Sequence, residues 1–206
     1  MTKTAVLLQA HLGSTRLPKK VLLPLGDMSI IEHCICTACQ SIVDSVIVCT
    51  TTSPSNDELI EHIETFQHRY PKLTVYRSHS DESNLIERYY QCAKEHNINI
   101  IVRCTSDSPL LSKNLIDIVV KTFLYYKPNV MDFMQIDGLE VQCIDFKSLE
   151  KAYNEANLDY EKEHIFPYIY AHPELFNIKH LNEIKLSIDE MSDYEKLRGI
   201  YECQAK

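Results

Sequence analysis

The sequence predicts an α/β fold, a three-layer α/β/α sandwich built around a mostly parallel, Rossmann-like sheet. Short apolar runs alternate with amphipathic segments along most of the 206 residues. This alternation is typical of parallel strands joined by right-handed helical crossovers. Internal repeats and Gly/Ser-rich linkers are absent from the sequence, so we expect a single domain over residues 1–206 that is large enough to bury a substantial core.

The first half of the chain contains four predicted strand and helix pairs. Residues 4–10 (TAVLLQA) form a continuous apolar run, which is typical of a strand buried on both faces. Residues 29–41 place Ile31, Cys34, Ile35 and Ala38 at helical spacing, which indicates a core-facing helix. By the same criteria, strands are predicted at 45–50, 73–76 and 98–103, and helices at 56–68, 83–96 and 112–126.

The second half follows a looser order. Residues 130–136 and 139–146 resemble strands and flank Asp137-Gly138, a residue pair that favours a hairpin turn. Helices are expected at 147–156 and 160–171. A strand at 184–188 (IKLSI) and a closing helix from about 191 complete the prediction.

Charge and cysteine content indicate the kind of partner. The net charge is −8, yet residues 1–26 carry four Lys or Arg and no acidic residue. An acidic chain is a poor partner for nucleic acid, which is bound mainly through its phosphates, so we expect a small-molecule partner. No signal peptide and no membrane span are expected from the short apolar runs. Eight cysteines, mostly inside apolar segments, favour free thiols and a cytoplasmic location.

Cys34, Cys36 and Cys39 form a C-x-C-x-x-C run that could suggest zinc. The run has no obvious fourth ligand, so it is a weak metal signal. The core stripe of the helix at 29–41 is the better interpretation of Cys34.

The cations gather in the loop that follows the first strand, where Gly13, Arg16 and Lys20 occur together. A dinucleotide-binding G-x-G-x-x-G is absent, and a P-loop is excluded because Pro18 stands where its second Gly is needed. Backbone N–H groups near Gly13 and Ser14, with the charges of Arg16 and Lys20, can instead hold a triphosphate whose two outer phosphates leave together as pyrophosphate.

Two carboxylates are predicted at the same sheet edge, because ligands of such sheets bind beyond the carboxyl ends of the strands. Asp107 follows the strand at 98–103, and Asp189 follows the strand predicted at 184–188. Both could hold Mg²⁺, which prefers carboxylate oxygens and retained waters. Asp107 could alternatively cap the next helix or begin a turn with Pro109, and Asp189 could cap the last helix.

The motif G-S-T-R-L-P-x-K, Gly13 to Lys20, resembles the opening signature of the nucleotidyltransferases that attach CMP to acidic sugars. The likeness is strongest to the branch of spore coat polysaccharide biosynthesis proteins of the SpsF type. Segments 86–111, 138–146, 163–168 and 186–194 fall in the same order as motifs of that family. The resemblance covers nearly the whole chain and implies the fold of nucleotide-diphospho-sugar transferases.

The resemblance also implies residue roles. Lys20, Arg16 and Asp107 look like the catalytic set, and Asp107 and Asp189 look like the Mg²⁺ ligands. The implied contacts to CTP, or to another NTP, come from Gln9, Ala10, His11, Gly13, Ser14, Arg16, Lys20, Arg77 and Ser106. The implied contacts to a small acidic sugar acceptor come from Gly138, Glu140, Gln142, Glu163 and His164. A homodimer is also implied, with a small dimerisation element within about 130–175. For Glu163 and His164, a plain helix-surface position is an equal alternative.

The chain departs from the family pattern in three places. His11 replaces the usual Arg at the exit of the first strand, and Lys19 replaces the usual Gly after Pro18. The segment 130–138 is also short. An imidazole cannot reproduce the five fixed donors of a guanidinium. Two other functions stay open: a glycosyltransferase that uses a nucleotide-sugar on a similar α/β sheet, and a nucleotide-binding module weakened in catalysis by His11.

Overall fold

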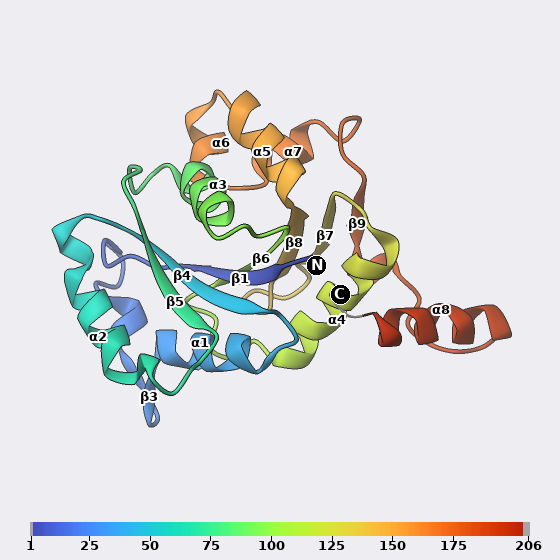
Figure 1. Ribbon diagram of the computed structural model, residues 1–206, viewed down its shortest axis with the longest axis horizontal. Helices are drawn as coiled ribbons and strands as arrows, with labels where there is room; N and C mark the ends of the chain where they lie inside the picture. The colour runs from blue at the N-terminus through green and yellow to red at the C-terminus, as the bar shows by residue number, and fades with distance from the viewer. Residues whose placement is uncertain (1, 204–206) are drawn as a thin grey trace.

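The computed structural model describes residues 2–203, and its centre is a seven-stranded sheet in the order β5-β4-β1-β6-β8-β7-β9 (Figure 1). The strands are β1 Thr4–Gln9, β4 Ser45–Thr51, β5 Leu73–Ser78, β6 Ile100–Thr105, β7 Val130–Phe133, β8 Val141–Asp145 and β9 Ile178–His180. β8 is antiparallel to both neighbours, and the other pairings are parallel. The prediction of a mostly parallel sheet is confirmed.

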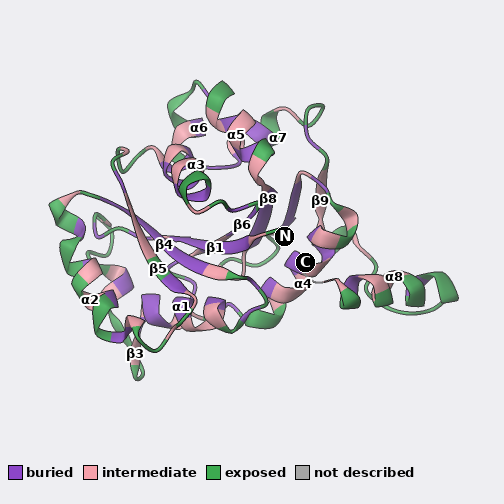
Figure 2. Ribbon diagram, viewed as in Figure 1, coloured by how far each residue is buried: buried purple, intermediate pink, exposed green. Residues whose placement is uncertain are grey.

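Helices cover both faces of the sheet, as the sandwich prediction requires (Figure 1). On one face lie α1 Ile30–Gln40, α2 Asp57–Gln67 and α4 Lys113–Tyr126; on the other lie α3 Leu85–Glu95, α5 Phe146–Glu155, α6 Asp159–Glu163 and α7 Pro167–Ala171. β1 alternates between them, because Val6 and Leu8 pack in one core and Ala5 and Leu7 in the other. Figure 2 shows the central strands buried and the outer helix faces exposed.

The helix that contains the cysteine run presents its core stripe inward. Ile31, Cys34, Ile35 and Ala38 of α1 are all buried in the core of that face. Ser29 caps the helix, because its side chain accepts a hydrogen bond from the Glu32 backbone N–H. The interpretation of this stripe as core is confirmed.

Short elements complete the chain. These are the 3₁₀ turns η1 Lys20–Leu22, η2 Pro54–Asn56 and η3 Leu181–Glu183, the small hairpin of β2 Pro24–Leu25 and β3 Met28–Ser29, and the closing helix α8 Met191–Glu202. α8 packs against α4 and projects from the sandwich at the right of Figure 1. None of the helices in the described part of the chain has the length and apolar character that a bilayer crossing requires.

Two predictions in the second half are wrong. The segment 184–188 forms no strand; the last strand is β9, which pairs with β7. The helix predicted at 160–171 is two helices, α6 and α7, because His164 is extended and Pro167 starts a new helix. Proline lacks the N–H that a continuing helix needs, but it suits a first helical turn.

The predicted hairpin is present with a longer connection. β7 and β8 pair from Val130 to Phe133, opposite Val141, so residues 134–140 form the loop. Within it, the Leu139 N–H donates to the Ile136 carbonyl at 3.0 Å. Gly138 has φ +79°, a left-handed conformation that favours glycine in this turn.

Candidate active site

The cationic loop leaves β1 at the carboxyl edge of the sheet and is held there by a buried asparagine. The Leu12 N–H donates to Asn56 Oδ1 at 2.9 Å. Asn56 is fully buried, and its amide donates to Thr51 Oγ1 at 2.8 Å and to Glu82 Oε1 at 2.9 Å. Asn56 stands directly before α2, a position at which asparagine is a common cap. Its side chain makes no cap in the structure and positions the loop instead.

Lys20 and Asp107 meet as an ion pair at this edge. Lys20 begins η1, whereas Asp107 follows β6, and β6 is the direct neighbour of β1 in the sheet. Ser106 joins the two strand ends, because its hydroxyl donates to the Gln9 carbonyl at 2.6 Å. Burial alone would raise the pKa of Asp107, but the hydrogen bond and charge of Lys20 lower that pKa below its usual value. The carboxylate is therefore ionised at neutral pH.

A small pocket of about 80 Å³ opens beside this ion pair, and one of the residues that line it, Gln9, carries an unsatisfied polar atom. Gln9 Oε1 is buried and has no hydrogen-bond partner among the described residues. Leaving such an acceptor unpaired costs free energy, so the atom is suited to a ligand that donates a hydrogen bond. The pocket is lined by Gln9, His11, Lys20, Val21, Thr105, Ser106 and Asp107.

The remaining predicted nucleotide contacts lie on the cationic loop, next to the end of β1, or on β5. Arg16 and Gly13 are exposed on the loop. His11 lies beside the loop, with its Nδ1 3.7 Å from Glu82 Oε2. Ala10 is buried and Ser14 is half-buried. Arg77 lies on β5 and forms an ion pair with Asp57 at 2.6 Å.

Lys19, where the family usually has glycine, adopts a left-handed backbone with φ +54°. An L side chain is disfavoured there, which is the cost expected from this departure. Its ammonium pairs with Glu58 and not with Asp107.

The structure does not bring Asp189 to Asp107. Asp189 lies just before α8, and its carboxylate is 2.8 Å from Lys185 Nζ. In Figure 1, α8 lies at the opposite side of the molecule from α2, which flanks the cationic loop. The strand predicted at 184–188, which would have returned Asp189 to the sheet edge, does not form. Asp189 does not cap α8 either, since Glu190 occupies the cap position.

The predicted acceptor residues separate into three places. Glu140, Gln142 and His164 line one pocket of about 250 Å³, together with Arg103 of β6. Glu163 instead borders a different hollow with Asp81 and Asn84. Gly138 serves the turn between β7 and β8.

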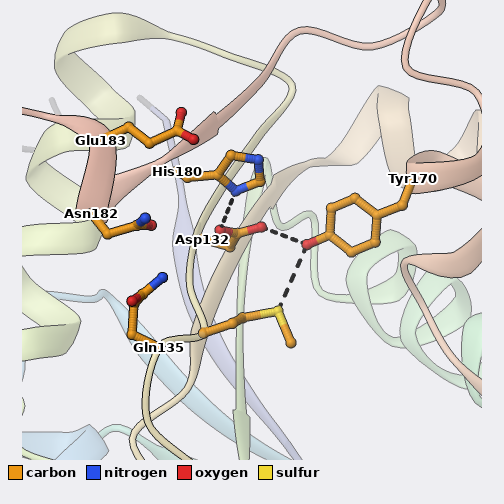
Figure 3. A pocket seen from close by; sticks show the side chains of 7 residues that line it. Asp132, Gln135, Tyr170, His180, Asn182 and Glu183 are labelled. Atoms are coloured by element: carbon orange, nitrogen blue, oxygen red, sulfur yellow. Dashed lines mark hydrogen bonds and ion pairs between the residues drawn. The ribbon is translucent and has the colours of Figure 1, made fainter.

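A further pocket, of about 330 Å³, adjoins the pocket lined by Arg103 and Gln142 (Figure 3). This pocket was not predicted from the sequence. Its floor is Asp132 of β7, which is almost fully buried. The Tyr170 hydroxyl donates to Asp132 Oδ2 at 2.6 Å, and His180 Nδ1 lies 2.7 Å from Asp132 Oδ1. Met134 and Tyr170 line both pockets.

The pair of Asp132 and His180 predicts a pH-dependent stability. The hydrogen bond to Asp132 raises the pKa of His180 above its ordinary 6.5, against a smaller opposing effect of burial. A raised folded-state pKa gives stability that is fully present below pH 6.5 and is lost as pH rises through the folded value. We expect His180→Gln to lower the urea midpoint most at about pH 5.5, and progressively less toward about pH 8.5.

The matched control is His33→Gln, because His33 Nε2 contacts only the Leu25 carbonyl, at 2.7 Å, and forms no carboxylate pair within residues 2–203. A deficit of His180→Gln that stays constant across this pH range would contradict the assignment of the pair.

No activated nucleophile accompanies the ion pair within the described residues. Cys34 lies near Ser108 and Asp107, but burial raises the pKa of its thiol to about 12, so it stays protonated. Thr105 and Ser108 hydrogen-bond to each other. The site can therefore bind and neutralise a polyanion, but it offers no group suited to covalent catalysis.

Comparison with known proteins agrees with this chemistry. A family model described as cytidylyltransferase matches residues 5–205. An uncharacterized protein of Methanocaldococcus jannaschii is 34% identical over 92% of this chain and 79% of its own length. The spore coat polysaccharide biosynthesis protein SpsF of Bacillus subtilis is 24% identical over 98% of this chain and 88% of its own. A 3-deoxy-manno-octulosonate cytidylyltransferase of Polynucleobacter asymbioticus is 27% identical over 87% and 69%.

Among solved structures, a cytidylyltransferase also has a similar fold. A cytidylyltransferase from Leptospira borgpetersenii superimposes with a TM-score of 0.80 at 33% sequence identity. The superposition covers 95% of this chain and 84% of the Leptospira chain. The similarity therefore extends over nearly the whole chain.

Proposed function

Because this chain belongs to the cytidylyltransferase family, we propose that it transfers CMP from CTP to a hydroxyl group of an acidic sugar and releases pyrophosphate. The observation that carries the proposal is the meeting of Lys20 and Asp107 beside Gln9, at the sheet edge where ligands of such folds bind. The relatives that act in spore coat polysaccharide biosynthesis and on 3-deoxy-manno-octulosonate support a sugar acid as the acceptor class.

This reaction requires the acceptor hydroxyl and the α-phosphorus to be positioned and the charge of the phosphates to be neutralised. A bond forms between the acceptor oxygen and the α-phosphorus, the bond from that phosphorus to the pyrophosphate oxygen breaks, and the hydroxyl proton leaves to solvent. Lys20 and Arg16 neutralise the phosphates that depart, where negative charge develops in the transition state. Lys20 already lies at this edge, whereas Arg16 is exposed on the loop.

Mg²⁺ fits this site in part. No group of three or more His, Cys, Asp or Glu that could hold a metal occurs within residues 2–203. Mg²⁺ typically uses one or two carboxylates together with substrate phosphates and waters, so a single carboxylate suffices. Asp107 would hold the ion. When bound, Mg²⁺ supplies positive charge to the triphosphate.

The ion pair must open when the nucleotide binds. A pocket of about 80 Å³ is far smaller than the several hundred Å³ of small-molecule sites. Separation of Lys20 from Asp107 frees the ammonium for phosphate and the carboxylate for the metal. The ion pair between Lys20 and Asp107 therefore compensates both charges until the nucleotide and Mg²⁺ bind and take its place.

The direct test is pyrophosphate release by the purified protein. We expect release to require CTP, Mg²⁺ and a sugar acid together, and we expect CTP to raise the thermal midpoint more than ATP, GTP or UTP, because a ligand that binds only the native state stabilises it. A glycosyltransferase, or a module that only binds nucleotides, would release no pyrophosphate. Absence of release with every NTP and every acceptor tried would overturn the proposal.

A further inference from the structure

Four neighbouring strands present polar side chains at one level of the sheet. Arg103 of β6 pairs with Gln142 of β8, Gln142 pairs with Asp132 of β7, and Asp132 pairs with His180 of β9. Residues paired across a sheet point to the same face. The four side chains therefore form a row beneath α7, which contributes Tyr170.

Hydrogen bonds connect the whole row. The Arg103 Nη1–H group donates to Gln142 Oε1 at 2.6 Å, and Gln142 Nε2 donates to the Tyr170 hydroxyl at 3.1 Å. Tyr170 and His180 then contact the two oxygens of Asp132 (Figure 3). Gln142 and Asp132 are 2% and 3% exposed. Breaking hydrogen bonds in a buried, low-dielectric environment costs free energy, so these side chains are fixed in orientation.

Arg103, at one end of the row, has hydrogen-bond donors that Gln142 does not use. A guanidinium carries five N–H donors, of which Gln142 engages one. Arg103 is half-buried, and no ion pair among residues 2–203 includes it, although Glu140 lines the same pocket. A cation in this setting binds an anion well, because the carboxylate geometry matches the fork of the guanidinium.

The row lies close to the proposed site of reaction. Arg103 precedes Thr105, the last residue of β6, by two positions, which is about 7 Å along a strand. His180 lies three strands away from Arg103, or about 14 Å across the sheet. Met134 and Tyr170 form a common wall of the two pockets above this row. One elongated ligand can therefore reach from the strand end near Asp107 to His180.

We infer that Arg103 binds the carboxylate of the acceptor sugar acid, while Tyr170 and His180, held by Asp132, bind the hydroxyl groups of its tail. This inference rests on the proposed function for the identity of the acceptor. It assigns recognition to the row and not to Glu163 or Gly138, which the structure places elsewhere. His180 Nδ1 is engaged by Asp132, so the other ring nitrogen is the one available for a hydroxyl.

The test separates the acceptor carboxylate from the rest of the reaction. The probes are 3-deoxy-manno-octulosonic acid and N-acetylneuraminic acid, each compared with its methyl ester. The variants are Arg103→Gln, Arg103→Lys and a matched control, Arg198→Gln, in which an exposed arginine on α8 is changed. The readouts are the acceptor-induced thermal shift without CTP, the acceptor KM, and the thermal shift by CTP alone.

We expect the wild type to bind at least one acid more tightly than its ester. Arg103→Gln should raise the KM of that acid about 10- to 100-fold and bring acid and ester to equal affinity. Arg103→Lys should lie between, because it keeps the charge and loses the fork. The CTP-induced shift should be unchanged in every variant, which shows that Arg103→Gln is folded.

The inference and the proposed function fail in different ways. Equal stabilisation of the wild type by acid and ester, or no stabilisation by either, overturns the role of Arg103 whatever CTP does. Retention of the acid preference in Arg103→Gln has the same meaning. Pyrophosphate release with a neutral hydroxyl compound would uphold nucleotidyl transfer while removing the carboxylate from the acceptor.

Discussion

Replacement of Lys20 by alanine is expected to abolish CTP-dependent pyrophosphate release. The ammonium lies at the sheet edge beside Gln9 and Asp107, where the proposed reaction develops charge on the departing phosphates. Loss of one such electrostatic contact typically costs about 100- to 1,000-fold in rate. We expect a decrease of at least this size in kcat/KM, together with loss of the CTP-induced thermal shift. Pyrophosphate assays and thermal unfolding measure both effects.

Lys19→Ala is the matched control, because Lys19 is the adjacent residue on the same loop and its ammonium pairs with Glu58. The same charge is removed, but not from the pocket. We expect its rate to remain within a few-fold of the wild type. Equal losses in Lys19→Ala and Lys20→Ala would mean that the loop acts through its overall charge and that Lys20 has no specific role.

The order of elements through α4 could be predicted because burial on both faces produces continuous apolar runs. β1 is such a run, and its residues divide between the two cores of the sandwich. β9 was not predicted, because Ile178, Lys179 and His180 are only half-buried and form no apolar run. The strand predicted at 184–188 was wrong, because Leu186 and Ile188 alternate as in a strand yet are exposed. Alternation without a partner strand does not make a strand.

The candidate site could likewise be predicted only in part. Lys20 and Asp107 could be predicted together because both follow neighbouring parallel strands, whose carboxyl ends share one edge. Asp189 could not be placed correctly without a correct last strand. The row from Arg103 to His180 depends on the register of β6, β8, β7 and β9, and long-range register cannot be read from one sequence.

Asp107→Asn is expected to remove activity and the response to Mg²⁺ together. Lys20 lowers the pKa of Asp107, although burial opposes this, so the group is an anion at the pH of the assay and can hold a metal. Asparagine keeps the shape and one acceptor oxygen but loses the charge. We expect kcat to fall by about 100-fold or more, with a midpoint of Mg²⁺ activation that moves to higher concentration or vanishes. A Mg²⁺ titration at saturating CTP measures this.

A structural explanation predicts a different result. Glu58→Gln, which removes the carboxylate partner of Lys19, is the comparable loss of an exposed ion pair and should be nearly neutral under either explanation. The structural explanation is that Asp107 only anchors Lys20. Asp107→Asn would then lose some stability but keep its Mg²⁺ midpoint. Because the pKa of Asp107 is lowered in the folded state, its contribution to stability is present above pH 3.8 and disappears as pH falls through the lower folded value. A wild-type Mg²⁺ midpoint in Asp107→Asn, with only this acid-side stability lost, would rule out the carboxylate as the metal ligand.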